Sequence, residues 1–256
     1  MNPMSLEGKN IIVTGAGQGI GKAIAKMAVD LGARVAIVDV NVDTLNATVD
    51  EIGSSGVKAY AGSVSDATFV QNMVDSVISD FGSIEGLVNN AGIVRAAMIE
   101  KMDEVTWDQV IDVNLKGVFL CLQAVGKHYI QKAKAGDPSP GALVNISSDA
   151  GRRGTIGQIN YGAAKSGVLG LTMSSAREWG RYGIRSNSVC FGMVETPMTE
   201  TIRSEKFIDK YLAQIPMGRI AKPDEVARPV CFLLSDAASY ITGQHLSVNG
   251  GFHIGV

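Results

Sequence analysis

A glycine-rich turn, TGAGQGIG at residues 14–21, places the strongest constraint on how this chain can fold. A short apolar run from Asn10 to Thr14 precedes the turn, and apolar residues at helical spacing follow it from Ile20 to Leu31. Strand, glycine turn and helix in this order predict a unit whose backbone N–H groups bind a pyrophosphate at the helix N-terminus. The predicted cofactor-binding residues of the turn are Gly15, Gln18, Gly19, Ile20 and Gly21.

The alternation of buried strand and amphipathic helix continues along the whole chain. Short apolar runs predict further strands at 33–38, 57–61, 84–88, 142–146, 184–190 and 246–248. Helical spacing predicts helices at 45–52, 67–81, 104–132, 161–179 and 223–234. This pattern is typical of an α/β fold, a Rossmann-type doubly wound parallel sheet of about seven strands with helices on both faces. No linker or repeat interrupts it, so we expect a single domain over residues 1–256.

An aspartate at the end of the second predicted strand, Asp39, indicates which dinucleotide binds. A carboxylate there accepts hydrogen bonds from the ribose hydroxyls of NAD and repels a 2′-phosphate. Val40 and Asn41 follow it, so no positive charge stands where a 2′-phosphate would need one. An ordinary turn aspartate is the alternative interpretation. We therefore expect NAD(H) as the cofactor.

Composition excludes several other classes of protein. The chain has 256 residues and a net charge of −2, with no run of like charges, which argues against a nucleic-acid or membrane partner. Residues 1–10 are polar and do not resemble a signal peptide. The cysteines at 121, 190 and 231 lie far apart in apolar surroundings, and the three histidines lack the spacing of a metal site. We expect a cytoplasmic enzyme without a metal.

The segment Tyr161-Gly162-Ala163-Ala164-Lys165 opens a predicted helix and carries candidate acid–base chemistry. Four residues make about one helical turn, so Tyr161 and Lys165 lie on the same face. An ammonium group close to a phenol favours the phenolate and lowers its pKa. The pair therefore predicts general acid–base catalysis by Tyr161.

Six motifs in order carry a resemblance over nearly the entire chain: TGAGQGIG at 14–21, NNAG at 89–92, Asn114 in NLKGVF, NISS at 145–148, YGAAK at 161–165 and GMVETPM at 192–198. The sequence resembles the classical short-chain dehydrogenases/reductases. The resemblance implies the catalytic residues Asn114, Ser148, Tyr161 and Lys165. Ser148 would hydrogen-bond the substrate oxygen, whereas Ser147 would face away. Lys165 would bind the nicotinamide ribose and lower the Tyr161 pKa, and Asn114 would hold a water in a proton relay behind it.

The resemblance also implies contacts to the cofactor outside the glycine turn. Asn90, with Ala91 and Gly92, would fix the cofactor loop, and Thr196 would reach the carboxamide. The backbone of Val194 would meet the nicotinamide amide. Two positions depart from the family pattern. Ser63-Val64 replaces the usual Asp-Val beside adenine, and Phe191 replaces a common proline.

Three segments are expected to line the substrate pocket: 93–98, 149–159 and a helical lid at 193–217. The candidate substrate contacts are Val94, Asp149, Ile156, Met193 and Met198. They make a mainly apolar pocket, which suits a hydrophobic secondary alcohol or ketone. Arg95, Arg152 and Arg153 could bind an acidic substrate, although solvated or interfacial arginines are the alternative.

The main hypothesis is an NAD-dependent short-chain alcohol dehydrogenase/ketone reductase. One alternative is a reductase of 3-oxoacyl thioesters of acyl carrier protein or CoA. These enzymes usually use NADPH, against which Asp39 argues. A second alternative is a non-catalytic dinucleotide sensor. The family resemblance further implies a homotetramer or homodimer, in which the helices near 104–132 and 157–179 pair with their copies. Gly162, Gly167 and Gly170 would allow close approach, and the apolar tail 250–256 would lie at an interface.

Overall fold

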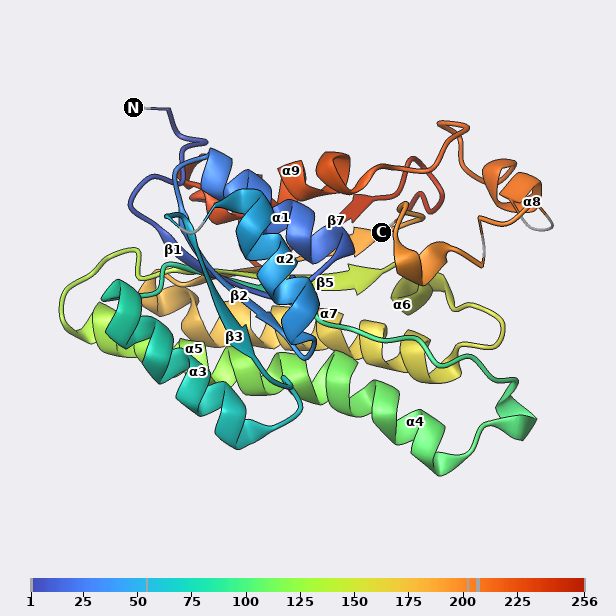
Figure 1. Cartoon of the computed structure of the whole chain (residues 1–256), viewed down its shortest axis with the longest axis horizontal. Coiled ribbons are helices and arrows are strands. Elements are labelled where there is room, and N and C mark those ends of the chain that lie inside the picture. Colours follow the sequence, from blue (N-terminus) through green and yellow to red (C-terminus); the bar gives the residue numbers. More distant parts are fainter. Residues whose placement is uncertain (1, 54, 202, 206–207, 256) are drawn as a thin grey trace.

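The computed structural model describes residues 2–53, 55–201, 203–205 and 208–255 and shows one sheet of parallel strands between two layers of helices (Figure 1). The sheet has seven strands in the order β3-β2-β1-β4-β5-β6-β7. Every neighbouring pair is parallel, as predicted for a doubly wound sheet. The strands are β1 (Asn10–Thr14), β2 (Arg34–Asp39), β3 (Val57–Ala61), β4 (Gly86–Asn89), β5 (Ala142–Ser148), β6 (Arg185–Phe191) and β7 (His245–Val248).

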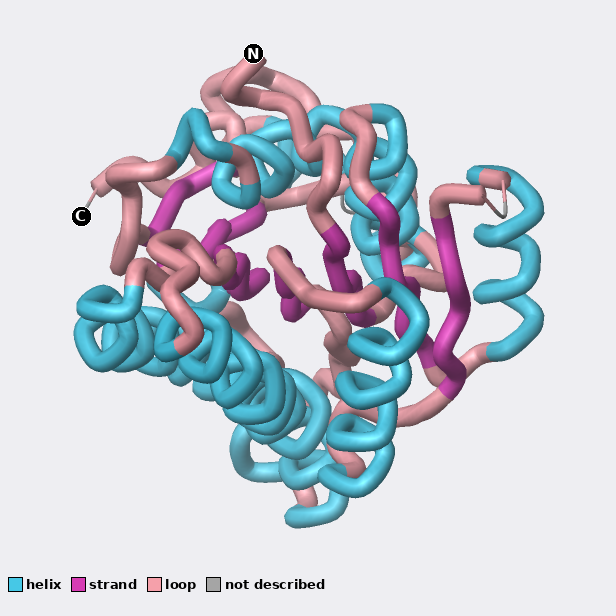
Figure 2. The backbone as a smooth tube through the Cα atoms, turned by 90° about the vertical axis from the view of Figure 1, so that its left-hand side faces the viewer, coloured by secondary structure: helices cyan, strands magenta, loops and turns pink. Residues whose placement is uncertain are grey.

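Helices cover both faces of the sheet, as the view in Figure 2 shows. One face packs against α1 (Gly19–Asp30), α2 (Val42–Ile52) and α9 (Pro223–Leu234). The other packs against α3 (Ala67–Phe81), α5 (Gly117–Lys134) and α7 (Ile159–Trp179). Three shorter helices, α4 (Glu104–Ile111), α6 (Ala150–Arg153) and α8 (Ile208–Leu212), lie towards the end of the molecule that holds the site.

Strand β1 is buried on both of its faces. All five residues of β1 are buried, and alternate side chains enter the two cores. Ile11 and Val13 pack with α1 and α9, whereas Ile12 packs with α3 and α5. Continuous apolar runs are typical of parallel strands covered on both sides.

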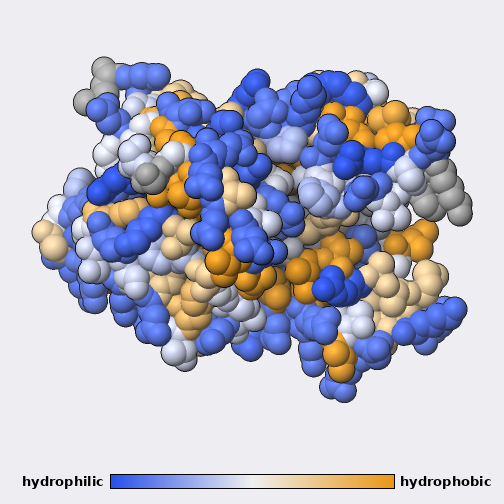
Figure 3. All heavy atoms as spheres, in the orientation of Figure 1, coloured by the Kyte–Doolittle hydropathy of each residue, from blue (hydrophilic) through white to orange (hydrophobic). Residues whose placement is uncertain are grey.

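Some segments differ in detail from the prediction. The single helix expected at 104–132 is α4 and α5 joined by a π-helical turn over Asp112–Lys116. The predicted lid contains a 3₁₀ turn at Pro197–Thr199 and the short helix α8, which stands away from the sheet in Figure 1. Two apolar residues of that lid, Ile202 and Phe207, lie outside the described residues. No helix in the described part of the chain is long and apolar enough to cross a membrane, and on the face drawn in Figure 3 hydrophilic residues surround smaller groups of hydrophobic ones.

The strand order reverses between β1 and β4, since β1 pairs with β2 on one side and with β4 on the other. In open α/β sheets, the crevice at the carboxyl ends of the strands beside such a switch point binds ligands. The predicted site residues follow these strand ends.

Candidate active site

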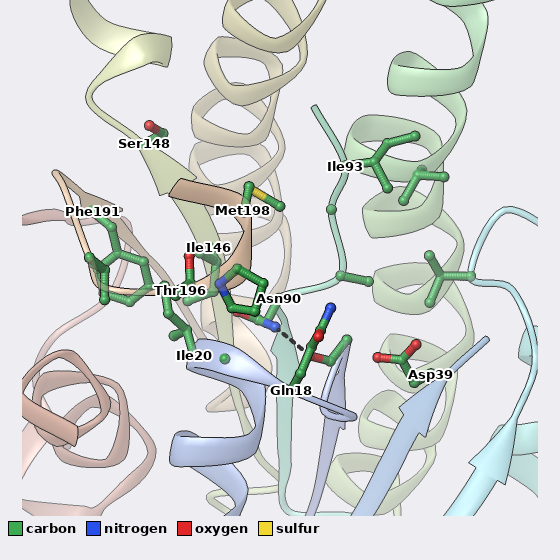
Figure 4. A pocket seen from close by; sticks show the side chains of 18 of the residues that line it. Gln18, Ile20, Asp39, Asn90, Ile93, Ile146, Ser148, Phe191, Thr196 and Met198 are labelled. Carbon is green, nitrogen blue, oxygen red and sulfur yellow. Dashed lines mark hydrogen bonds between the residues drawn. The ribbon is translucent and has the colours of Figure 1, made fainter. Parts of the chain in front are cut away.

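A cavity of about 500 Å³ opens at the carboxyl ends of the central strands. Asp39 and Ser148 lie at opposite ends of it in Figure 4, with Asn90 between them. Such an elongated cavity suits an extended dinucleotide. Most of the predicted site residues line it: Gly15, Gln18, Gly19, Ile20, Asp39, Ser63, Val64, Asn90, Ala91, Gly92, Ser148, Tyr161, Lys165, Val194, Thr196 and Met198.

Hydrogen bonds fasten the glycine turn to the end of β4. Asn90 Nδ2 donates to the carbonyl oxygens of Thr14 (3.0 Å) and Gly15 (3.1 Å). Thr14 Oγ1 in turn accepts the N–H groups of Asn90 and Ala91, each at 3.0 Å. Thr14 was absent from the predicted site, although it opens the TGAGQGIG motif. These bonds hold the two segments that are expected to bind the cofactor in one fixed arrangement.

Two glycines of the turn permit a close approach that no other residue would. Gly15 has a φ of +64°, and a Cβ there would lie 2.8 Å from Cα of Ala91. A Cβ at Gly21 would collide with the Gly15 carbonyl oxygen and lie 2.6 Å from Asn90 Nδ2. Gly21 therefore acts from below the cavity, by letting α1 pack against the turn, and does not line it.

The N-terminus of α1 fits a phosphate group. Gln18 is its N-cap residue, and within the described structure the Gln18 side chain makes no capping hydrogen bond to the helix. The first N–H groups of a helix lack partners within the helix and carry the positive end of its dipole. They can therefore bind the pyrophosphate of a dinucleotide.

Asp39 lies at the end of the cavity where a ribose of the cofactor is expected. Its carboxylate accepts the N–H of Gly17 (3.1 Å) and the N–H of Asn41 (3.2 Å). Within the described chain, Lys165 is the only lysine or arginine that lines the cavity. The Asp39 end therefore presents negative charge, which suits ribose hydroxyls and opposes a phosphate.

Ser63 and Val64 line the cavity at the expected adenine end. The Ser63 hydroxyl lies 2.8 Å from Ser65 Oγ and accepts the Ser65 N–H at 3.2 Å. Its bonds thus hold the turn after β3, and a hydroxyl group stands where the family usually has an aspartate carboxylate.

Tyr161 and Lys165 both face the cavity from the first turns of α7. Lys165 Nζ lies 5.7 Å from the centre of the Tyr161 ring and donates to the Ile146 carbonyl oxygen at 2.8 Å. Burial lowers the Lys165 pKa to about 8. Burial also raises the Tyr161 pKa, although a hydrogen bond with Ser148 opposes this change. The net shift of the tyrosine is opposite to the expectation, because burial penalises the phenolate more than its neighbours stabilise it.

The side chains of the two serines at the end of β5 have different surroundings, because successive side chains of a strand point to opposite faces of the sheet. Ser147 is buried, and its hydroxyl donates to the Lys165 carbonyl oxygen at 2.8 Å. Ser148 Oγ accepts the Ala150 N–H at 3.2 Å, so its own proton points away from this N–H and towards the side of the cavity where Tyr161 lies.

Asn114 lies in the π-helical turn and is fully buried behind the cavity. Its side chain accepts the Ile93 N–H (2.8 Å) and donates to the Ile93 carbonyl oxygen (2.9 Å). The side chain thus holds the segment that follows Gly92. Its role in a water relay stays a prediction.

Most of the predicted substrate contacts lie elsewhere. Only Met198 lines the cavity; Val94 and Met193 do not, and Ile156 is 88% exposed on a loop. Asp149 is buried, and its carboxylate accepts hydrogen bonds from Asn249. Residues that line the cavity without having been singled out as contacts include Ile93, Val113, Ile146 and Phe191. Ile93 opens the segment 93–98 that was expected to line the pocket, and Ile146 lies in the NISS motif.

The three candidate arginines contact other parts of the protein. Arg95 donates to the Val94 carbonyl oxygen (2.9 Å), and Arg152 donates to Ser247 Oγ (2.6 Å). The Arg153 guanidinium lies 3.7 Å from the centre of the Phe252 ring. These contacts favour a structural role over recognition of an acidic substrate.

Comparison with known proteins agrees with this geometry. The family model described as enoyl-(acyl carrier protein) reductase matches residues 15–253. The 3-oxoacyl-[acyl-carrier-protein] reductase FabG of Thermotoga maritima is 43% identical over 98% of this chain and 100% of its own length. The (3R)-3-hydroxyacyl-CoA dehydrogenase of Canis lupus familiaris is 38% identical over 99% of both chains.

A solved structure shows the same fold. It belongs to a candidate short-chain alcohol dehydrogenase from Sinorhizobium meliloti 1021, which is 34% identical with a TM-score of 0.91. The match covers 97% of this chain and 98% of that chain. The chain belongs to the short-chain dehydrogenase/reductase family and is an oxidoreductase of that family.

Proposed function

We propose that the protein interconverts 3-oxoacyl and 3-hydroxyacyl thioesters with NAD(H) as its cofactor. The observation that carries the reaction type is the placement of the Ser148 and Tyr161 side chains on one cavity beside Lys165. The thioester class is supported by two relatives named for a 3-oxoacyl and a 3-hydroxyacyl thioester. This was the alternative to a simple hydrophobic alcohol, and it keeps the same chemistry, because the 3-hydroxyl is a secondary alcohol and the 3-oxo group a ketone.

In reduction, the 3-oxo oxygen lies between Ser148 and Tyr161. Ser148 donates a hydrogen bond to it, and Tyr161 supplies the proton that completes the hydroxyl group. A raised Tyr161 pKa suits this step, because the phenol then carries its proton throughout the neutral range. The nicotinamide, when bound, supplies the two electrons as hydride. In oxidation, Tyr161 takes the hydroxyl proton, and its ammonium neighbour Lys165 favours the phenolate that this step needs.

The choice of NAD(H) rests on Asp39. Its carboxylate lies at the end of the cavity where the adenosine ribose would bind, and the described residues there include no cation. Gln18, Val40 and Asn41 complete that end of the cavity. A 2′-phosphate would find one negative charge and no partner.

The proposal is tested by measuring the loss of NADH absorbance with 3-oxoacyl-CoA, 3-oxoacyl-[acyl-carrier-protein] and simple hydrophobic ketones. We expect the highest kcat/KM with a thioester, and no turnover by Tyr161→Phe. A higher kcat/KM with a simple ketone than with a thioester would indicate that the substrate is a hydrophobic ketone. Tight NADH binding without turnover of any substrate would instead favour a dinucleotide sensor.

A homotetramer or homodimer is part of the proposal. Phe119 on α5 (44% exposed) and Met173 on α7 (47% exposed) leave apolar surface on the two helices expected to pair with their copies. The cytoplasmic location expected from the sequence stays a prediction.

A further inference from the structure

The C-terminal segment Asn249–Phe252 contacts two parts of the site at once. On one side, the Gly250 carbonyl oxygen accepts the N–H of Met217 at 3.1 Å, where the expected lid ends. On the other side, Phe252 lies under the guanidinium of Arg153, the last residue of α6. Helix α6 directly follows the strand end that carries Ser148 (Figure 1).

A buried carboxylate–amide pair makes the central contact between this segment and α6. Asp149 is 3% exposed, and both oxygens of its carboxylate accept Asn249 Nδ2, at 3.0 and 2.9 Å. Asn249 Nδ2 also donates to the His253 carbonyl oxygen (3.0 Å), and its Oδ1 accepts the Gly251 N–H (3.0 Å). Every polar atom of the Asn249 side chain is therefore used. A buried carboxylate without such partners would be costly, so the pair fixes both segments.

The pair is connected to Ser148 through two backbone contacts. The Asp149 N–H donates to the Phe191 carbonyl oxygen at 3.0 Å, which fixes the chain where it leaves β5. Asp149 is the N-cap residue of α6, and the next N–H, that of Ala150, donates to Ser148 Oγ at 3.2 Å. A hydroxyl oxygen that accepts this bond directs its own proton elsewhere.

We propose that Asp149 and Asn249 are positioning residues for Ser148. By anchoring α6 to the C-terminal segment, they hold the Ala150 N–H where it orients the Ser148 hydroxyl towards the substrate oxygen. Neither side chain lines the cavity, so both act through the backbone. The inference rests on the role of Ser148 in the proposed reaction, and not on the identity of the thioester.

The same pair relates the catalytic serine to the lid. A Cβ at Gly250 would lie 2.9 Å from Ile215 Cγ2, and one at Gly251 would lie 2.8 Å from Pro216 Cγ. The C-terminal segment Asn249–Phe252, which binds the Asp149 carboxylate through Asn249, is thus packed closely against residues 215–217. Asn249 therefore links this part of the lid to α6.

Asn249→Ala is the first test, because it removes the amide and leaves the cavity lining unchanged. We expect kcat to fall about tenfold to a hundredfold, as for a misplaced catalytic group. The dissociation constant for NADH, which Ser148 does not contact in the proposed arrangement, should stay within about twofold. Hydrogen exchange of the backbone over residues 148–154 should become faster. Ile254→Ala, a change at a side chain 82% exposed in the same tail, is the matched control and should alter none of these quantities.

The exchanged pair Asp149→Asn/Asn249→Asp separates positioning from simple stability. It restores an amide-to-carboxylate hydrogen bond, although the bond to the His253 carbonyl oxygen is lost. We expect it to recover most of the lost kcat and the slow hydrogen exchange, whereas Asp149→Asn alone should not.

A folded Asn249→Ala protein with the kcat and hydrogen exchange of the unchanged protein would overturn the inference. So would a parallel loss of NADH binding and kcat, which would indicate general destabilisation. If the unchanged protein reduces no thioester, the proposed function fails by itself. The inference is then decided by hydrogen exchange at 148–154 in the single and exchanged variants, for which unchanged exchange is the negative result.

Discussion

At the scale of single residues, burial governs the acid–base groups on α7. It lowers the pKa of Lys165 to about 8 and raises that of Tyr161. At neutral pH, both groups therefore hold their protons, so Tyr161 is ready to act as an acid and Lys165 is a cation. A protonated Tyr161 suits the proton donation that the proposed reduction requires of it.

The Lys165 pKa predicts how cofactor capture depends on pH. Because kcat/KM for NADH reports the groups of the cofactor-free protein, it should fall as pH rises through about 8, where Lys165 loses its charge. Initial rates at varied NADH and a saturating concentration of the carbonyl substrate, between about pH 6 and pH 10, measure this profile. Lys165→Arg, whose side chain keeps its charge over this range, should lack the decline near pH 8, even if its rates are lower. A flat profile for the unchanged protein would contradict the prediction.

Asp39→Asn tests the origin of cofactor preference. The amide keeps one oxygen to accept the N–H of Gly17 or Asn41 but removes the negative charge that repels a 2′-phosphate. We expect the KM for NADH to rise about tenfold, which corresponds to about 1.4 kcal/mol, and the preference for NADH over NADPH to narrow. The measurement is kcat/KM with each cofactor. Thr44→Ala, near the same turn but without charge, is the control and should leave the preference unchanged.

At the scale of secondary-structure elements, the glycine turn matters because it lets α1, β1 and the end of β4 meet. Asn90 and Thr14 make the hydrogen bonds of this junction. Gly21 leaves room for them because it has no side chain.

Gly21→Ala should disrupt this junction. The added methyl group would meet the Gly15 carbonyl oxygen and Asn90 Nδ2, neither of which can move without breaking the turn. We expect the free energy of unfolding to fall by about 1–3 kcal/mol, as for other overpacked sites, and NADH affinity to fall more than about tenfold. Chemical denaturation and fluorescence titration measure the two effects. Lys26→Ala on the exposed face of α1 should change neither; equal effects of both substitutions would show that the turn is not the cause.

The elements themselves could be predicted because their signals are local. Apolar runs ending in glycine or aspartate defined β1 and β2, and Pro223 marked the start of α9. The π-helical turn around Asn114 could not be predicted, because apolar spacing is almost the same on either side of it. The orientation of Asp149 could not be predicted for a different reason: Asp149 follows Ser148 in sequence, but its side chain binds Asn249, far along the chain. The spacing of apolar residues along the sequence does not indicate which way the side chain of a loop residue points.

At the scale of the whole molecule, contacts within a single chain explain some of the glycines that were expected at a helix interface. Gly167 needs no partner molecule to explain it, since a Cβ there would lie 2.8 Å from Leu115 Cδ1 of the same chain. A Cβ at Gly162 would likewise lie 3.3 Å from the Ala150 carbonyl oxygen. Gly170 differs, because a Cβ there meets nothing within 4 Å among the described residues. Of the three glycines expected at a helix interface, Gly170 is therefore the one whose presence the single chain does not explain.

Gly170→Glu tests the proposed assembly through α7. In a single chain, the substitution should be tolerated, since the site is open and glutamate forms helices better than glycine by roughly 0.5–1 kcal/mol. In a symmetric assembly that pairs α7 with its copy, two carboxylates would be brought together and the mass by light scattering should fall. Gly170→Ala, which adds only a methyl group, is the matched comparison, and circular dichroism would confirm that both variants are folded. An unchanged mass for Gly170→Glu would place α7 in solvent and move the interface to another surface, because a closed symmetric contact cannot accommodate two buried like charges without separating.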